Sequence, residues 1–390
     1  MKPPQHSVSG SDLPRSANTQ SFATPRDRQL TAWLEAHAER LDSGRDLAQA
    51  VLPMLGNAGL LHIGVPEALG GAGGDIAHAI EAIAGVAESS MTAALVFWSQ
   101  RALIECLLHS DNHALRDGWL PALLNGKMAG AVGLSNAMKY LAKMESLHVT
   151  ATDARQDGGS PVRRLSGTLP FVTNLHADGY VTAIAAAHSD GTPPSIYAVA
   201  HDARGVQRSA DLDLIALRAS NTAALTLNRM PVDERHMIAS NAVSFIASVR
   251  PNFLGLQCGL SIGLARRSLR SLHHASESVR ATLGADGQAW VSALEDRVVE
   301  LFDGLASSAL HDIPAALFNL RLQFATLVEA AVALEVQAAG SRGFMHGSSE
   351  VARRRREASF IPVLTPSVVQ LRQILLAASG HATLRHRSQA

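Results

Sequence analysis

The side chains best placed for chemistry lie in two short segments near the C-terminus, residues 337–346 and 356–367. The first joins a glutamine to two spaced glycines, small residues that let a backbone approach a ligand closely. The second carries the hydroxyl of Thr365, which is far too weak a base to remove a proton from carbon at neutral pH unless a neighbour activates it. No His or Lys stands beside Thr365 in sequence. His346 is therefore the nearest titratable candidate for acid–base chemistry.

The same two segments resemble the closing signature of the acyl-CoA dehydrogenase family. Residues 337–344 read Q-A-A-G-S-R-G-F, where the family usually has Q-x-x-G-G-x-G-Y. Residues 356–367 read R-E-A-S-F-I-P-V-L-T-P-S, where the family has R-D-A followed by E-G-T. Aligned on the arginine, the catalytic glutamate of E-G-T falls on Thr365, its glycine on Pro366 and its threonine on Ser367. The resemblance implies an active-site segment that lacks its carboxylate.

Four further segments resemble family landmarks in the expected order. Residues 60–75 read L-L-H-I-G-V-P-E-A-L-G-G-A-G-G-D, and residues 165–187 contain P-F-V-T-N before an apolar strand. Residues 217–231 match the family's R-x-S-x-T strand, and residues 280–284 echo its R-x-x-F-G. The resemblance implies an α+β fold with an N-terminal α-helical domain, a middle β-barrel domain and a C-terminal four-helix bundle.

The hydrophobic periodicity also divides the chain into three blocks. Apolar residues recur at three and four positions over residues 26–128, which predicts helices. Short β-rich runs separated by Gly, Asp, Ser and Pro occupy residues 129–238 and predict a compact antiparallel barrel or sandwich. The helical period returns over residues 239–385 in long segments typical of a four-helix bundle. Residues 1–25 have no apolar core and predict a disordered leader.

The resemblance implies FAD as the cofactor. The family's W-I-T segment, which lies against the flavin ring, corresponds here to Phe171, Val172 and Thr173, so an aromatic ring and the threonine hydroxyl are both retained. The family's T-E-P-x-x-G-S-D segment corresponds to residues 134–139, where Leu134 and Ser135 match its beginning. The Gly-Ser pair that approaches the pyrophosphate is absent. From the residues alone, Phe171 is equally well explained as a core residue of the barrel.

Three more positions match residues that, in the family, complete the FAD site of a neighbouring subunit. Arg280 matches an arginine that bonds the pyrophosphate, and Gln337 and Gly340 match residues beside the adenosine. A solvated arginine and a plain helix C-cap are the alternative interpretations. The resemblance implies a homodimer or homotetramer.

In some family members the glutamate stands on an earlier helix, before a G-x-x-G-L segment. That segment reads G-L-S-I-G-L here, at residues 259–264, and the corresponding position is Phe253. The sequence therefore predicts that the base is missing from both known positions.

Composition excludes several classes of partner. The formal net charge of zero gives no electrostatic argument for nucleic acid or an anionic membrane, and the basic run at residues 353–356 predicts a solvated helix face. No uninterrupted apolar run reaches the length of a membrane span. The two cysteines have neither a disulfide framework nor a metal-ligand spacing, so no metal site is predicted. A cytoplasmic location is the expectation.

Three functions remain open at this point. The first is an FAD-dependent oxidoreductase acting on an acyl thioester, held on coenzyme A or on a carrier protein, with a missing or relocated base and an electron acceptor as partner. The second is a flavin-dependent monooxygenase or oxidase of the same fold, in which dioxygen is the partner and no α-proton base is needed. The third is a non-catalytic binding or scaffold member.

Overall fold

The computed structural model describes residues 25–154, 162–345 and 350–387. Helices make up the N-terminal part: α1 (Pro25–Ser43), α2 (Ala48–Asn57), α3 (Ile76–Ser89), α4 (Met91–Leu108) and α5 (His113–Leu124). Short 3₁₀ turns, η1 (Leu60–His62) and η2 (Glu67–Leu69), lie between α2 and α3. Asp75 and Ser90 cap the amino ends of α3 and α4 through hydrogen bonds from backbone N–H groups.

The middle part is an eight-stranded sheet with one short helix, α6 (Ser135–Leu141). Its strands are β1 (Ala129–Gly133), β2 (Val149–Ala154), β3 (Val162–Val172), β4 (Tyr180–His188), β5 (Ser195–Ala200), β6 (Val206–Asp211), β7 (Ala223–Val232) and β8 (Met237–Ala239). The strand order is β6-β7-β3-β2-β4-β5-β8, and β1 pairs with β4. Among the described residues no ladder joins β6 to β8, so the sheet is open at its two ends.

The expectation of a wholly antiparallel sheet is wrong at β4. This strand pairs in parallel with both β1 and β2, and antiparallel with β5. Parallel neighbours need a crossover connection in place of a tight hairpin. The chain between β1 and β4 supplies it by passing through α6, β2 and β3.

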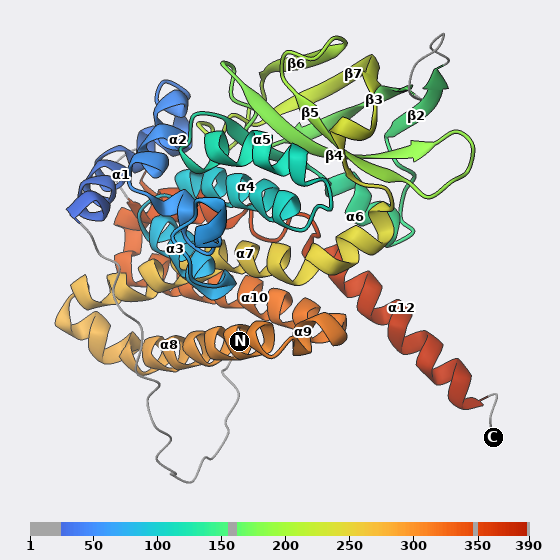
Figure 1. Cartoon of the computed structure of the whole chain (residues 1–390). Coiled ribbons are helices and arrows are strands. Elements are labelled where there is room, and N and C mark those ends of the chain that lie inside the picture. The colour runs from blue at the N-terminus through green and yellow to red at the C-terminus, as the bar shows by residue number, and fades with distance from the viewer. Residues whose placement is uncertain (1–24, 155–161, 346–349, 388–390) are drawn as a thin grey trace.

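The C-terminal part returns to helices: α7 (Ala242–Ser271), α8 (Glu277–Ala306), α9 (Ala309–Asp312), α10 (Pro314–Ala339), α11 (Glu350–Ala358) and α12 (Val368–Arg387). The long helices α7, α8 and α10 pack together. Helix α12 contacts α10 and then extends away from the body of the molecule (Figure 1). The predicted fold class, α+β with helical, sheet and helical parts in that order, is confirmed.

Helix α4 lies between the sheet and the bundle, in contact with both β1 and α7 (Figure 1). Glycines on α7 let α3 approach closely beside it, since a Cβ at Gly263 would lie 2.1 Å from the carbonyl oxygen of Ala84. By length and composition alone, α4 and the span 314–344 could cross a bilayer, although charged residues interrupt both. The α4 window is 94% buried inside the fold, which is the environment of a core helix.

Candidate functional site

A cavity of about 560 Å³ lies where the sheet, α4, α7 and the segment after α11 meet. Its wall is mostly apolar, and the larger side chains include Leu95, Trp98, Leu214, Phe253, Phe360 and Leu364. Hydroxyl groups from Ser135, Thr173, Thr222 and Thr365 also line it. An apolar cavity with a few polar groups directed toward it is the usual form of a small-molecule site.

The cavity gathers half of the residues that the sequence singled out. Leu134, Ser135, Phe171, Thr173 and Thr365 all line it, although they come from segments that are distant in the chain. Leu134 contributes from a buried position, and Ser135 is exposed. The sheet and the segment after α11 therefore meet at one site.

Phe171 stands near the end of β3 and is 61% exposed. The alternative interpretation of this residue as a core side chain of the sheet is wrong. An aromatic ring that stays exposed on a cavity wall offers a flat surface on which another planar group can stack.

Thr173 follows β3 and is fixed from two sides. Its Oγ1 lies 3.1 Å from Oγ1 of Thr222, and its carbonyl oxygen accepts a hydrogen bond of 3.2 Å from the Ser99 hydroxyl. Asn174 turns away from the cavity, since its buried amide donates to Gln100 Oε1 and to the Gly130 carbonyl. Thr173 thus presents a hydroxyl in the cavity, and Asn174 anchors the strand end to α4 and β1.

Thr365 is anchored to α7. Its carbonyl oxygen accepts a 2.7 Å hydrogen bond from Nε2 of Gln257, which is fully buried. Phe253 lies one turn earlier on the same face of α7 and also lines the cavity. The two positions at which the sequence comparison placed a glutamate therefore meet at one cavity, and neither carries a titratable group.

The titratable side chains that do line the cavity, within the described part of the chain, belong to one wall. Glu145 accepts a hydrogen bond of 2.8 Å from Nδ2 of Asn136 and pairs with Lys139 at 3.4 Å and His148 at 3.8 Å. The Asn136 hydrogen bond lowers the pKa of Glu145, and the charges of Lys139 and His148 act in the same direction. A lowered pKa makes this carboxylate a weaker proton acceptor than an ordinary glutamate.

The sequence did not indicate that Glu145 and His148 belong to the site. Lys139 stood at the end of the segment compared with the flavin-binding motif, but Glu145 and His148 had no motif to mark them. Their position depends on Asn136, whose side chain is buried and whose Oδ1 accepts a hydrogen bond from the His148 backbone N–H at 2.7 Å.

The other predicted residues do not reach the cavity. Arg280 is exposed on α8, where Nη1 donates to the carbonyl oxygen of Ala275. Gln337 is exposed in the last turn of α10, and Gly340 has a φ of +58° directly after that helix. Ser367 caps α12, since its hydroxyl accepts from the backbone N–H of Gln370 at 3.2 Å. His346 lies outside the described residues.

The basic run on α11 is not a solvated face, contrary to the sequence expectation. Arg353 and Arg354 are buried, at 4% and 3% exposure. Arg353 pairs with the fully buried Glu357 at 2.9 Å, and Arg354 pairs with Glu335 of α10. The charge of the run alone predicted a solvated face, because neither the burial of Glu357 on the same helix nor the approach of Glu335 from α10 can be seen in the sequence.

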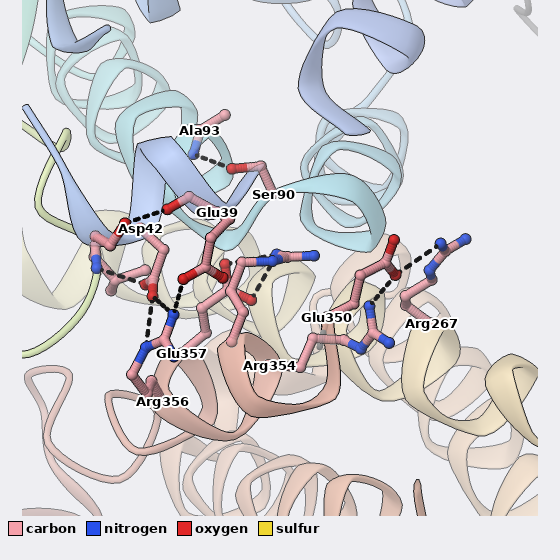
Figure 2. Close-up of polar contacts among 12 residues, drawn as sticks. Glu39, Asp42, Ser90, Ala93, Arg267, Glu350, Arg354, Arg356 and Glu357 are labelled. Carbon is pink, nitrogen blue, oxygen red and sulfur yellow. Dashed lines mark hydrogen bonds and ion pairs between the residues drawn. The ribbon is translucent and has the colours of Figure 1, made fainter. Parts of the chain in front are cut away.

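Arg356 connects this network to the N-terminal helices. Its Nε lies 2.9 Å from Oδ2 of Asp42, and its Nη2 lies 2.7 Å from Oε1 of Glu39, both on α1 (Figure 2). The other oxygen of Asp42 accepts from the backbone N–H of Leu217 at 2.8 Å, and Leu217 lines the cavity. The R-E-A segment therefore holds α11 in place just before the stretch that carries Thr365.

Known proteins resemble this chain in sequence and in fold. Residues 23–127 match the model of the acyl-CoA dehydrogenase N-terminal domain. The long-chain specific acyl-CoA dehydrogenase of Sus scrofa mitochondria is 26% identical over 208 residues, which cover 48% of this chain and 43% of that protein. The aligned part thus spans less than half the length of that relative.

Solved structures share the fold over nearly the whole chain. An acyl-CoA dehydrogenase from Bacillus anthracis, complexed with FAD, superposes with a TM-score of 0.76 at 18% identity, covering 95% of this chain and 69% of that one. FkbI, described as serving biosynthesis of the methoxymalonyl extender unit of the polyketide Fk520, superposes with a TM-score of 0.74 at 20% identity, covering 92% and 99%.

Proposed function

We propose that this chain, which is acyl-CoA dehydrogenase-like in sequence and fold, binds FAD with the flavin ring in the cavity and an acyl thioester beside it. The observation that carries the proposal is the meeting of Phe171, Thr173 and Thr365 at one apolar cavity. Those are the positions that the sequence resemblance assigned to the flavin and to the reacting carbon of the substrate.

The residues present fit the ring end of FAD. Phe171 offers an exposed aromatic face, Thr173 offers a hydroxyl, and the surrounding wall is apolar. The phosphate end has less support within one chain, because Lys139 is the cationic side chain among the described residues that line the cavity, apart from His148 when it is protonated. The phosphates are therefore expected to bind Arg280 of a second copy of the chain. The Arg280 side chain is exposed on α8 and so is accessible to such a copy.

Bound FAD would supply the capacity to accept a hydride from the substrate. The chain's own residues would bind the acyl group against the apolar wall, keep water away from it and orient the thioester beside Thr365. They supply no strong base at either Thr365 or Phe253, and Glu145 is held by its contacts with Asn136 and Lys139. Slow dehydrogenation of ordinary acyl thioesters is the expected consequence.

The lack of a base at Thr365 and Phe253 favours a second candidate function, a monooxygenase or oxidase that uses dioxygen. Such a reaction needs reduced flavin and a closed, water-poor cavity but no base for an α-proton. A cavity that retains the positions for flavin contact and lacks both glutamates suits that chemistry. A binding or scaffold role without catalysis is the third candidate.

The absorbance spectrum of the purified, FAD-supplemented protein separates the candidates. Anaerobic bleaching of the flavin band by an acyl-CoA supports the dehydrogenase. Turnover that needs both dioxygen and a reductase supports the oxygenase. Failure to bind FAD at any concentration would overturn both flavin-dependent functions.

Replacing Thr173 by Val should weaken FAD binding. Loss of one hydrogen bond of ordinary strength costs about 0.5–1.5 kcal/mol, which is roughly a 2- to 12-fold rise in Kd. Thr168→Val is the matched control, because Thr168 of β3 makes the same kind of hydroxyl contact, with Thr226 at 3.1 Å, but does not line the cavity. Equal Kd values for both variants would place the flavin elsewhere.

The protein should form a dimer or tetramer, and FAD binding should depend on it. Arg280, Gln337 and Gly340 face outward on the bundle, so one chain alone cannot bring them to its own cavity. Light scattering at micromolar concentration should give two or four times 41.2 kDa. Arg280→Gln should weaken FAD binding at unchanged mass. A monomer that binds FAD as tightly as the assembled protein would contradict this arrangement.

A further inference from the structure

We infer that the acyl group accepted by this cavity is short, and that Trp98 and Phe253 set its limit. The inference rests on the proposed function, since it concerns the acyl part of the substrate that the cavity would bind. It goes beyond that function by naming the substrate class and the side chains that select it.

The two aromatic side chains join α4 to α7 at the cavity wall. Trp98 of α4 and Phe253 of α7 both line the cavity, and their rings meet edge to face with centroids 5.4 Å apart and planes at 75°. Trp98 is 6% exposed and Phe253 is 3% exposed, so little of either ring is free. Their contact forms the part of the cavity wall at which α4 meets α7.

The surface that they present is apolar. The Nε1 atom of Trp98 is covered and has no hydrogen-bond acceptor among the described residues, so the exposed part of the indole is carbon. Leu95, one turn earlier on the same face of α4, also lines the cavity. Such a wall favours an alkyl group over a polar one.

Charged side chains lie behind the aromatic pair. One turn further along α4, Arg101 is fully buried with Nη2 3.7 Å from Oε2 of Glu105. Glu105 in turn accepts a 2.7 Å hydrogen bond from Nδ2 of Asn252, the neighbour of Phe253 on α7. A longer alkyl chain pushed between the helices would displace paired charges, which is unfavourable in a buried place. The apolar path therefore stops at Trp98 and Phe253.

The consequence can be measured as a dependence of affinity on chain length. In an open apolar pocket, each added methylene raises affinity about fourfold. Here the rise should stop after the first few carbons. The probes are S-alkyl pantetheine thioethers from ethyl to dodecyl, because the pantetheine arm is common to coenzyme A and to carrier proteins and the thioether cannot react. Calorimetry of the FAD-loaded protein gives the Kd of each probe.

The wild-type protein should bind the ethyl to butyl probes with rising affinity and gain nothing from longer ones. Trp98→Leu and Phe253→Leu shorten the aromatic side chains, so each should extend the rise by two or more methylenes, about tenfold or more for the hexyl and octyl probes. Phe97→Leu is the control, because Phe97 is fully buried beside Trp98 but does not line the cavity. Thermal melts identify any variant that is unfolded.

Fourfold gains that continue to dodecyl in the wild-type protein would overturn the length limit and leave the proposed function standing. Plateaus that stay at the same length in both folded leucine variants would overturn the role of Trp98 and Phe253. Absence of binding by every probe, in the wild type and in the variants alike, would overturn the proposed function and the inference together.

Discussion

Replacing Thr365 by Glu should raise the rate of flavin reduction by an acyl-CoA by about 10²- to 10⁴-fold, the usual contribution of a positioned general base. Thr365 lines the cavity, so a longer side chain at this position can extend into existing space. The measurement is the anaerobic rate of bleaching of the flavin band after mixing with butyryl-CoA. Adding Pro366→Gly restores the family's residue there and frees the backbone next to the new carboxylate.

Two controls make the result specific. Thr365→Gln adds the same bulk without a base and should give no gain. Phe253→Glu tests the second position on α7 at which some relatives carry their base, and it should give a smaller gain or none because it also removes part of the aromatic wall. Rapid reduction in the wild-type protein that survives Thr365→Ala would show that another residue supplies the base, and His346 would then be the first to mutate.

Replacing Glu335 by Ala should destabilise the protein by about 3 kcal/mol, because the change leaves a buried guanidinium without its main partner. Arg354 is 3% exposed, and its Nε lies 3.1 and 3.0 Å from the two carboxylate oxygens of Glu335. Glu350 still contacts Arg354 at 2.8 Å, which keeps the loss at the lower end for a broken buried pair. Chemical denaturation gives the free energy of unfolding.

The matched control for this change is Glu329→Ala, an exposed glutamate on the same helix, which should change stability by less than about 0.5 kcal/mol. The double variant Glu335→Ala with Arg354→Met should recover much of the loss, because no buried charge remains. A loss for Glu335→Ala equal to that of Glu329→Ala would contradict the importance of the pair.

The order of helical and sheet parts could be predicted because it depends on local patterns. Apolar spacing of three and four residues marks helices such as α3 and α10, and β-branched runs such as residues 195–200 mark strands. The parallel pairing of β4 with β1 and β2 could not be predicted in this way. It depends on which strands meet after α6, and nothing in the strand sequences encodes it.

The residues of the candidate site also differ in whether the sequence could predict them. Thr173 and Thr365 could be found from the sequence because each sits in a segment with a family resemblance. Glu145 and His148 could not, since only the fold brings them to the cavity wall. Arg353 and Arg354 are buried beside Glu357 of the same helix and Glu335 of α10, so two residues of a basic run that looks solvated in sequence lie in the interior.

An experimental structure of the FAD complex tests the central claim most directly. We expect the flavin ring in the cavity beside Phe171 and Thr173, with Thr365 on the side where a thioester would lie and no carboxylate in contact with that position. A flavin bound outside this cavity would contradict the assignment of the site. A glutamate or aspartate next to the position of the substrate would contradict the claim that the base is missing.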